Sequence, residues 1–585
     1  MKTSKPDISI LLLALLWLLM STFGVGYLSQ LEANGLFLFS WDFMMQKLAA
    51  PGGALAYLAV LLTQFFHLPG LGSLIWVMLC ALCGRLTQKL TGHSSLLSLF
   101  PAACATAAAM GLGYMIFKLK LPAHAFTTLL GAICSVALVL LYRKSTHKIP
   151  FLCLMAVLGY PLIGFYSLLA VLGAAMSDAR SRNWKSLPTA IALIAIVPIL
   201  WVQLFTTTRP ANAYLALVPV FTNGCSWIYY VPYCLMFLFI VSGQLLPACS
   251  NRIQRAIEPA VLVLMVTLFW TKDADFNAEM RMARATDSMQ WEKSLKAYRR
   301  ASALKEPTRI MVLYRNLALI RLGIEGDECF NYRDGSMKQR TPVHISESQQ
   351  AGRQLFIHFG LPNYTYRWCF ENNAETGWSV TDLRYMAMCS IVTENKNTAT
   401  KYLDILQKTL FYRRWAHEQW QYVQTPQKME ASATYGPILS LTTGKNMLGN
   451  DNTLLEIYLN TRFLTEPDRS PEFCRVAMLW AALSQKSRYF WPAFNNYAAS
   501  NMLTEIPVQY QQAMLLFNWM FNNAEIGRIP FDPEVRQEFF RFQKFFEQHP
   551  IEDPEKMEKL YRKEFGNTYY YYYFFHQNQS LVFQK

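Results

Sequence analysis

The chain of 585 residues carries 54 Lys and Arg against 39 Asp and Glu, a formal net charge of +15, and 53% of its residues are hydrophobic. The excess charge belongs mainly to the apolar first half, because residues 1–270 hold 16 basic and only five acidic residues. These basic residues flank apolar runs, where they would meet lipid head groups. A nucleic-acid-binding protein would instead gather them on a polar domain. The composition therefore favours membrane lipids and excludes nucleic acid as a partner.

The first apolar run, ISILLLALLWLLMSTFGVGYL at residues 8–28, follows a short basic tail. A cleaved signal peptide is one interpretation of this pattern, but the run is long and no A-x-A cleavage site follows it. Further apolar runs come directly afterwards. We therefore predict an uncleaved signal anchor whose N-terminus lies in the cytoplasm.

Eight more segments have a length and composition typical of membrane spans: 51–66, 70–86, 96–117, 123–142, 149–176, 187–205, 228–247 and 256–270. With the first run they make about nine spans. The segment 149–176 contains Pro161 and Gly164 near its middle, which predicts either one kinked helix or two half-helices. Nine spans from a cytoplasmic N-terminus would place the C-terminal half outside the cytoplasm.

The distribution of positive charge hardly tests this arrangement. The predicted cytoplasmic loops hold nine basic residues: Lys2, Lys5, Lys118, Lys120, Arg180, Arg182, Lys185, Arg252 and Arg255. The predicted outer loops hold eight: Lys47, Arg85, Lys89, Arg143, Lys144, Lys148, Arg209 and Lys272. Either one span is miscounted, or the outer face carries basic residues for a purpose such as binding lipid phosphate.

The second half, residues 271–585, reads as shorter amphipathic helices. In QWEKSLKAYRRASALKEP (290–307) the residues Trp291, Leu295, Tyr298 and Ala301 fall on one helix face. Pro307 ends that helix, and RIMVLYRNLALIRLG (309–323) predicts a second helix closed by a glycine. This order resembles a tetratricopeptide repeat. We therefore predict an all-α protein: a polytopic membrane domain at 1–270 and a tetratricopeptide-like helical repeat domain at 271–585.

Signatures of metal sites, phosphate-binding loops and hydrolase nucleophiles do not occur in a credible context, so the sequence predicts no cofactor. Cys80 and Cys83 lie within an apolar helix, where small packing residues are expected. The aromatic ending TYYYYYFF (568–575) predicts a cap packed on the last helices, with a patch at the membrane interface as the alternative.

Two acidic residues in the first predicted outer loop, Glu32 and Asp42, are the candidate functional residues. The structural interpretation of SWDFMMQKL (40–48) is an interfacial helix capped by Ser40, with Asp42 in its first turn and Lys47 near its end. In that case the acid of Asp42 stabilises a helix start and has no chemical role.

The functional interpretation comes from a resemblance. A membrane half with an acidic residue in its first outer loop, followed by an outer soluble domain, is similar to the multispanning glycosyltransferases that use lipid-phosphate sugars (the GT-C superfamily). The resemblance implies Asp42 as the catalytic base and Glu32 as a second candidate. It also implies that Arg85, Lys89, Arg143, Lys144 and Arg209 hold the phosphate of a polyprenyl-phosphate sugar. The paired acidic motif usual in that loop is missing here.

A second resemblance covers nearly the whole chain. SWDFMMQKLAAPGGALAYLAVLLTQFFHLPGLGSLIW (40–76) and LPNYTYRWCFE (361–371) resemble an uncharacterised bacterial family of multispanning membrane proteins. It implies a multi-pass protein of the bacterial inner membrane but no activity, and with nine spans the C-terminal domain would be periplasmic. Two functions stay open: a glycosyltransferase, or a non-enzymatic scaffold whose repeat domain binds a partner protein or peptide.

Overall fold

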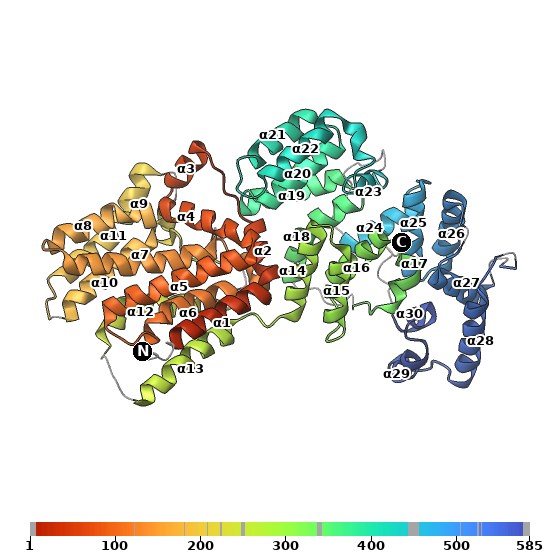
Figure 1. The fold of residues 1–585 in the computed structure, drawn as a ribbon, viewed down its shortest axis with the longest axis horizontal. Helices are drawn as coiled ribbons and strands as arrows, with labels where there is room; N and C mark the ends of the chain where they lie inside the picture. The colour runs from red at the N-terminus through yellow and green to blue at the C-terminus, as the bar shows by residue number, and fades with distance from the viewer. Residues whose placement is uncertain are drawn as a thin grey trace, which may run out of the picture. The chain divides into compact units, whose positions relative to one another are not determined.

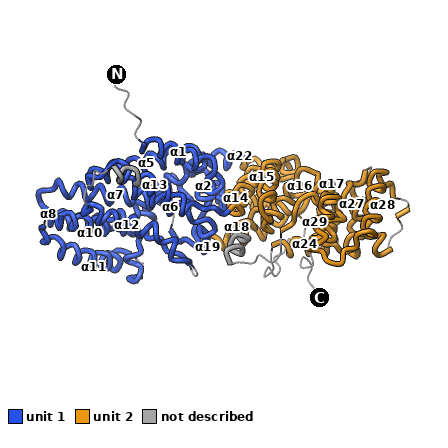
Figure 2. Tube along the Cα trace, turned by 90° about the horizontal axis from the view of Figure 1, so that it is seen from below, with its two compact units in different colours: residues 1–273, 373–383, 402–418 blue, residues 274–372, 384–401, 419–585 orange. Residues whose placement is uncertain are grey.

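The computed structural model describes residues 8–576 apart from 122, 181, 207–208, 223–224, 247–251, 336–341, 443–454, 504, 523–525 and 528. The described chain is all-helical, and its only β-type pairing is an isolated antiparallel bridge between Leu119 and Phe221 (Figure 1). It forms two compact units (Figure 2). Unit 1 comprises residues 1–273, 373–383 and 402–418, and unit 2 comprises residues 274–372, 384–401 and 419–585.

The helices of unit 1 in its first 273 residues are α1 (Ile8–Thr22), α2 (Val25–Ala33), α3 (Trp41–Leu48), α4 (Gly53–Thr63), η1 (Gln64–His67), α5 (Pro69–Thr91), η2 (Leu97–Leu99), α6 (Phe100–Met110), η3 (Gly113–Lys118), α7 (His124–Lys144), α8 (Lys148–Val157), α9 (Gly159–Ile163), α10 (Phe165–Arg180), α11 (Ser186–Phe205), η4 (Pro210–Leu215), η5 (Trp227–Tyr230), α12 (Val231–Ser242), η6 (Gly243–Leu245) and α13 (Arg252–Phe269). Sequence signals set several boundaries. Pro69 opens α5, where its missing N–H costs nothing, and Gly92 closes α5 at a positive φ of 73°.

Four helices of unit 1 end at one place, which we call the Arg143 end. Arg143 in the last turn of α7 donates through Nη1 to the carbonyl of Leu90 at the end of α5. Its Nε donates to Ser177 Oγ in the last turn of α10 at 2.6 Å. Its Nη2 donates at 2.7 Å to Gln244 Oε1, directly after α12. One guanidinium therefore joins the C-terminal ends of α5, α7, α10 and the α12 segment.

Five helices begin at the Arg143 end. Lys148 at the start of α8 donates to the carbonyls of Tyr142 and Arg143, and α11 follows α10 after a short loop. Near the start of α13, Glu258 accepts from Ser94, which lies between α5 and α6. Helix α1 runs antiparallel to α5, because Trp17 late in α1 donates to the carbonyl of Gly70 at the start of α5. The chain thus leaves this end through α1, α6, α8, α11 and α13, and returns through α5, α7, α10 and α12.

This topology corrects two details of the predicted spans. The segment 51–66 forms α4 and η1 without returning to the Arg143 end, since Gly52 at its start bonds to the carbonyls of Tyr160 and Pro161, more than three turns along from Lys148. Of the two alternatives for 149–176, the structure shows separate helices and not one kinked helix. The chain reverses at Gly164, at a φ of 61°, so that α8 and α10 run antiparallel. One expected passage is lost at 51–66 and one is gained at 149–176, so the number of passages is unchanged. The loops between these two segments, however, lie on the opposite side from the one predicted.

Length and composition single out fewer candidate membrane helices than the nine expected. Four helical segments of the described chain are long and apolar enough to cross a membrane: Pro69–Thr91, His124–Lys144, Ser186–Phe205 and Trp227–Leu245. The pair α1 and α2, bent by 72°, adds a fifth if it forms one crossing. Four more apolar helical segments are shorter, at 10–17 residues: Gly53–His67, Leu97–Met110, Lys148–Val157 and Glu258–Phe269.

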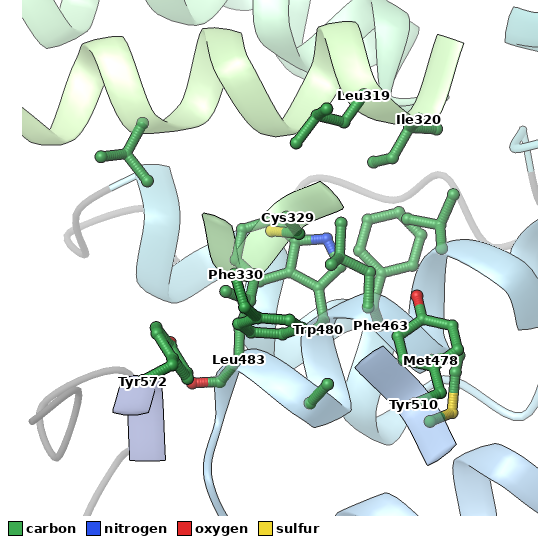
Figure 3. Close-up of a cluster of buried hydrophobic side chains, with 14 of the residues drawn as sticks. Leu319, Ile320, Cys329, Phe330, Phe463, Met478, Trp480, Leu483, Tyr510 and Tyr572 are labelled. Atoms are coloured by element: carbon green, nitrogen blue, oxygen red, sulfur yellow. The ribbon is translucent and has the colours of Figure 1, made fainter. Parts of the chain in front are cut away.

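The remaining helices run from residue 274 to residue 575: α14 (Ala274–Asp287), α15 (Trp291–Ser302), α16 (Arg309–Leu322), α17 (Glu325–Glu328), η7 (Cys329–Asn331), α18 (Pro342–His358), α19 (Pro362–Thr376), α20 (Val380–Val392), α21 (Lys396–Leu406), α22 (Arg413–Gln424), η8 (Pro426–Met429), α23 (Gly436–Leu439), α24 (Leu455–Thr465), α25 (Pro471–Leu483), α26 (Ser487–Asn501), α27 (Val508–Phe521), α28 (Pro533–Gln548), α29 (Pro554–Phe565) and α30 (Tyr569–Phe575). The core of unit 2 brings together α16, α25, α27 and α30 around Trp480 and Phe330 (Figure 3).

The predicted helix pair at 290–323 is confirmed. Leu295 and Tyr298 of α15 are buried, Thr308 caps α16 by accepting from the N–H of Met311, and Gly323 ends α16 at a φ of 72°. The tyrosine-rich ending forms α30, whose residues Tyr569 to Tyr572 are buried against the other helices of unit 2. The prediction of a packed aromatic cap is therefore confirmed as well.

Candidate functional site: a buried acid at the end of α2

A bend in the chain positions the first candidate acid. Gly24 separates α1 from α2, and a Cβ at this position would come within 2.8 Å of the carbonyl oxygen of Met20. Only glycine fits this close approach, which accompanies the 72° bend between the two helices. Helix α2 then carries Glu32 in its last turn, where the negative end of the helix dipole disfavours a carboxylate.

The carboxyl group of Glu32 is removed from water, with 3% of the residue exposed. Its Oε2 accepts a hydrogen bond of 2.9 Å from the hydroxyl of Tyr412. The Nδ1 atom of His67, from η1, lies 3.8 Å from the same oxygen. A buried acid, an imidazole and a phenol therefore meet at the end of α2, brought together from three distant parts of the chain.

The late segment 402–418 supplies Tyr412 and contacts the first helices at further points. The ring of His67 stacks on Phe411, with centroids 4.7 Å apart, and meets Tyr412 edge-on at 5.2 Å. The N–H of Phe39 donates to the carbonyl of Lys408 at 2.8 Å. These contacts explain why residues 402–418 belong to unit 1 although they lie far along the sequence.

Two polar side chains at this site, Glu32 and Gln64, have atoms without a hydrogen-bond partner among the described residues. Within the described part of the chain, Glu32 Oε1 and both amide atoms of the fully buried Gln64 have no hydrogen-bond partner. Gln64 Nε2 lies 3.4 Å from the place where a Cβ on Gly35 would stand, next to the carbonyl of Glu32. A buried polar group without a partner costs about 1–3 kcal/mol. The site can therefore form further hydrogen bonds without losing existing contacts.

Asp42 lies in a different environment. It is exposed in the first turn of α3, and the Oγ of Ser40 accepts from the N–H of Phe43 as the N-cap. Lys47 occupies the last turn of the same helix. The predicted capped helix is confirmed, and its Phe43 is buried against Phe37 and Val60.

The five predicted phosphate-holding residues do not gather around Asp42. Arg85 and Lys89 lie in the last two turns of α5, and Arg143 and Lys144 end α7, so these four belong to the Arg143 end. Arg209 follows α11 and lies away from that end. The sequence placed all five on the side of Asp42, whereas the structure puts four of them at the Arg143 end, because segment 51–66 does not return to that end. Arg143, moreover, is held by three protein acceptors.

Sequence reasoning named Glu32 but missed its partners. No local pattern links Tyr412 to Glu32, since 380 residues separate them. His67 carried a weak signal as a polar residue between two predicted spans, and Gln64 as a polar residue near the end of the first of them. No group of three or more His, Cys, Asp or Glu side chains in the described residues could hold a metal ion.

Comparison with known proteins gives one match. A family model described as "Family of unknown function (DUF6057)" matches residues 1–576, and the chain belongs to this family. Neither the search of curated proteins nor that of solved structures found a match.

Proposed function

We propose that this member of DUF6057 is a multi-pass integral membrane protein in which unit 1 is the membrane anchor. The observation that carries the proposal is the surface of α11: its 20 residues are strongly apolar, yet only 17% of its most apolar window is buried. Ile191, Ile196 and Leu204 are each more than half exposed. Such a helix would aggregate in water, whereas lipid is its natural solvent.

The sidedness follows from charge. Of the 15 basic residues between residues 8 and 273, ten lie at the Arg143 end: Arg85, Lys89, Arg143, Lys144, Lys148, Arg180, Arg182, Lys185, Arg252 and Arg255. The other five are Lys47, Lys118, Lys120, Arg209 and Lys272. The excess of Lys and Arg in cytoplasmic loops assigns the Arg143 end to the cytoplasm. The chain enters unit 2 after an odd number of passages, so unit 2 lies outside, in the periplasm if the membrane is a bacterial inner membrane.

For activity we propose a scaffold. The acids Glu32 and Asp42 lie away from the Arg143 end, so the arrangement does not join a catalytic base to a cluster of phosphate-binding cations. Unit 2 instead offers a series of helices, of which the pair α15 and α16 resembles a tetratricopeptide repeat. Stacked repeats of this kind bind peptides and proteins along one face. Unit 1 would then hold unit 2 on the outer side of the membrane that unit 1 spans, where unit 2 captures a protein or peptide partner.

The anchor is tested by extracting membranes with alkaline carbonate. Full-length protein is expected in the membrane pellet, and its release into the supernatant would contradict the proposal. The scaffold is tested by crosslinking in intact cells from an exposed unit 2 position, such as Phe370→Cys. A specific protein adduct is expected. Retention of the cellular phenotype after deletion of unit 2 would contradict the scaffold.

A glycosyltransferase using a polyprenyl-phosphate sugar is the second candidate, and one observation favours it. Glu32 is a buried carboxylate hydrogen-bonded to Tyr412, with its second oxygen unpaired. Such a group suits proton transfer better than the exposed Asp42, so Glu32 becomes the first candidate base. Lipid-linked sugar pools are compared between Glu32→Gln and Asp42→Asn cells. Accumulation of a lipid-linked sugar donor in Glu32→Gln cells alone would support a glycosyltransferase. Unchanged pools in both variants would exclude that activity.

A further inference from the structure

The Arg143 end carries a concentrated positive surface. Six basic residues there are exposed, and they come from neighbouring chain ends: Arg85 and Lys89 from α5, Lys144 from α7, Arg180 from α10, and Arg182 and Lys185 from the loop that follows. Arg143 binds α5, α7 and α10 at this point, so these side chains share one end of unit 1. None of the six has a carboxylate partner in the described part of the chain within ion-pair distance.

Asp178 and Glu258, the described acidic residues at this end, accept hydrogen bonds from neighbouring hydroxyl groups. Asp178 accepts a hydrogen bond of 2.6 Å from the hydroxyl of Tyr142, and Glu258 accepts one of 2.6 Å from Ser94. Glu258 is buried and Asp178 is half-buried. Among the described residues, the exposed charged side chains at the Arg143 end are therefore basic, without acidic ones between them. Six like charges this close repel one another unless an anion lies among them.

The flanking surface identifies the anion. Trp184, in the same loop as Arg182 and Lys185, is 57% exposed, and tryptophan is favoured where head groups meet acyl chains. Ile149 near the start of α8 and Ile191 in α11 are also exposed, so apolar surface begins beside the basic residues. Positive charge bordered by apolar surface matches a lipid, which offers a phosphate and an acyl chain together.

We propose that the Arg143 end is a binding surface for anionic phospholipid head groups of the leaflet in which it lies. The inference rests on the proposed membrane anchor. In this proposal Arg85, Lys89 and Lys144 still bind a phosphate group. That phosphate belongs to a membrane phospholipid and not to a polyprenyl-phosphate sugar. Each basic residue near an anionic surface strengthens attraction by roughly fivefold at low salt. The surface should therefore enrich anionic lipid strongly over zwitterionic lipid.

The test is lipid competition on full-length protein. Detergent-purified protein is equilibrated with equal amounts of phosphatidylglycerol and phosphatidylcholine, and the bound lipids are counted by native mass spectrometry. Wild type is expected to carry phosphatidylglycerol in at least about tenfold excess. Two variants, R85Q/K89Q/K144Q and R180Q/R182Q/K185Q, are each expected to lose most of that excess. The matched control, K47Q/K118Q/R209Q, removes three charges away from this end and is expected to keep it.

Three results would overturn the proposal. The first is an unchanged excess in both basic variants, and the second is an equal loss in the control. The third is displacement of phosphatidylglycerol by millimolar inorganic phosphate, which would identify a free-phosphate site. Thermal unfolding in detergent shows whether each variant is folded, and two separate triple variants keep the test decisive if one fails. Failure of the anchor itself would show differently, as release from membranes by carbonate.

Discussion

Unit 1 and unit 2 treat charged residues in opposite ways. Unit 2 buries ion pairs: Arg315 Nη1 lies 2.7 Å from Asp334 Oδ1, and both side chains are almost fully buried. Unit 1 exposes apolar side chains along α1, α8 and α11, and most basic residues of its first 273 positions lie at one end. A protein in water hides apolar surface and places most charge outside, whereas a bilayer reverses the preference along the lipid-facing surface. This is the difference that the proposed membrane anchor predicts, with lipid around unit 1 and water around unit 2.

The largest expected effect is on the buried charges of unit 2. Asp334→Asn leaves the guanidinium of Arg315 buried without its carboxylate, which should destabilise unit 2 by about 3–5 kcal/mol. Thermal unfolding monitored by circular dichroism measures the loss. The control is Glu371→Gln, whose ion pair with Arg367 is solvent-exposed and should contribute within about 0.5 kcal/mol. Equal losses of stability in the two variants would show that burial does not determine how much an ion pair contributes to the stability of unit 2.

The same buried pair predicts an acid dependence. Burial raises the pKa of Asp334, but the guanidinium groups of Arg315 and Arg309 outweigh it and lower that pKa to about 2. A carboxyl whose folded pKa lies below its unfolded value of 3.8 stabilises the fold above that value. This stabilisation should disappear as the pH falls from about 4 to 2. Unfolding midpoints of wild type and Asp334→Asn should therefore converge across this window, and a constant difference would contradict the assignment.

A charge placed on the apolar surface of unit 1 tests the difference in solvent directly. Ile196 lies at the middle of α11 and is 53% exposed, so Ile196→Arg would be harmless in water. At the centre of a membrane helix it should oppose insertion by about 3 kcal/mol. The matched control, Leu304→Arg, changes an 84% exposed residue of unit 2 and should be neutral. Membrane-inserted yield measures both, and equal yields would argue against lipid around α11.

A smaller effect is expected at the Glu32 cluster. Tyr412→Phe removes the hydrogen bond to Glu32 and should cost about 1 kcal/mol, mostly by loosening residues 402–418. Arg413 and Arg414 are exposed beside it, so trypsin should cleave there several times faster. The control Tyr422→Phe changes a phenol that donates to Ser432. Unchanged cleavage in Tyr412→Phe would show that the hydrogen bond does not hold the segment.

The smallest effect is expected at Asp42. Asp42→Asn removes an exposed charge in the first turn of α3 and should change stability by less than about 0.5 kcal/mol. Ser40→Ala removes the N-cap and should cost about 1 kcal/mol. The two variants are compared by thermal unfolding. A larger loss in Asp42→Asn would require a partner for that carboxylate.

The sequence predicted local structure well and long-range geometry poorly. The helix starting after Ser40, the pair 290–323 and the aromatic ending were correct because caps, glycines and apolar spacing act within a few residues. The reversal at Gly164 was not predictable from GYPLIGFY, since hydropathy is the same for a kinked span and a hairpin. Arg85, Lys89, Arg143 and Lys144 were misplaced earlier in the chain, because 51–66 is as apolar as a span but does not return to the Arg143 end. Tyr412 was invisible for a related reason, because its partner is fixed only by tertiary packing.

The loop between α7 and α8 tests the central claim most directly. The span count made from sequence places Thr146 outside the cytoplasm, whereas the Arg143 end places it inside. Thr146→Cys and Leu304→Cys, each in a cysteine-free background, are treated in intact cells with a membrane-impermeant thiol reagent. We predict that Leu304→Cys is labelled and that Thr146→Cys is labelled only after the cells are broken. Labelling of Thr146→Cys in intact cells, or protection of Leu304→Cys, would contradict the topology.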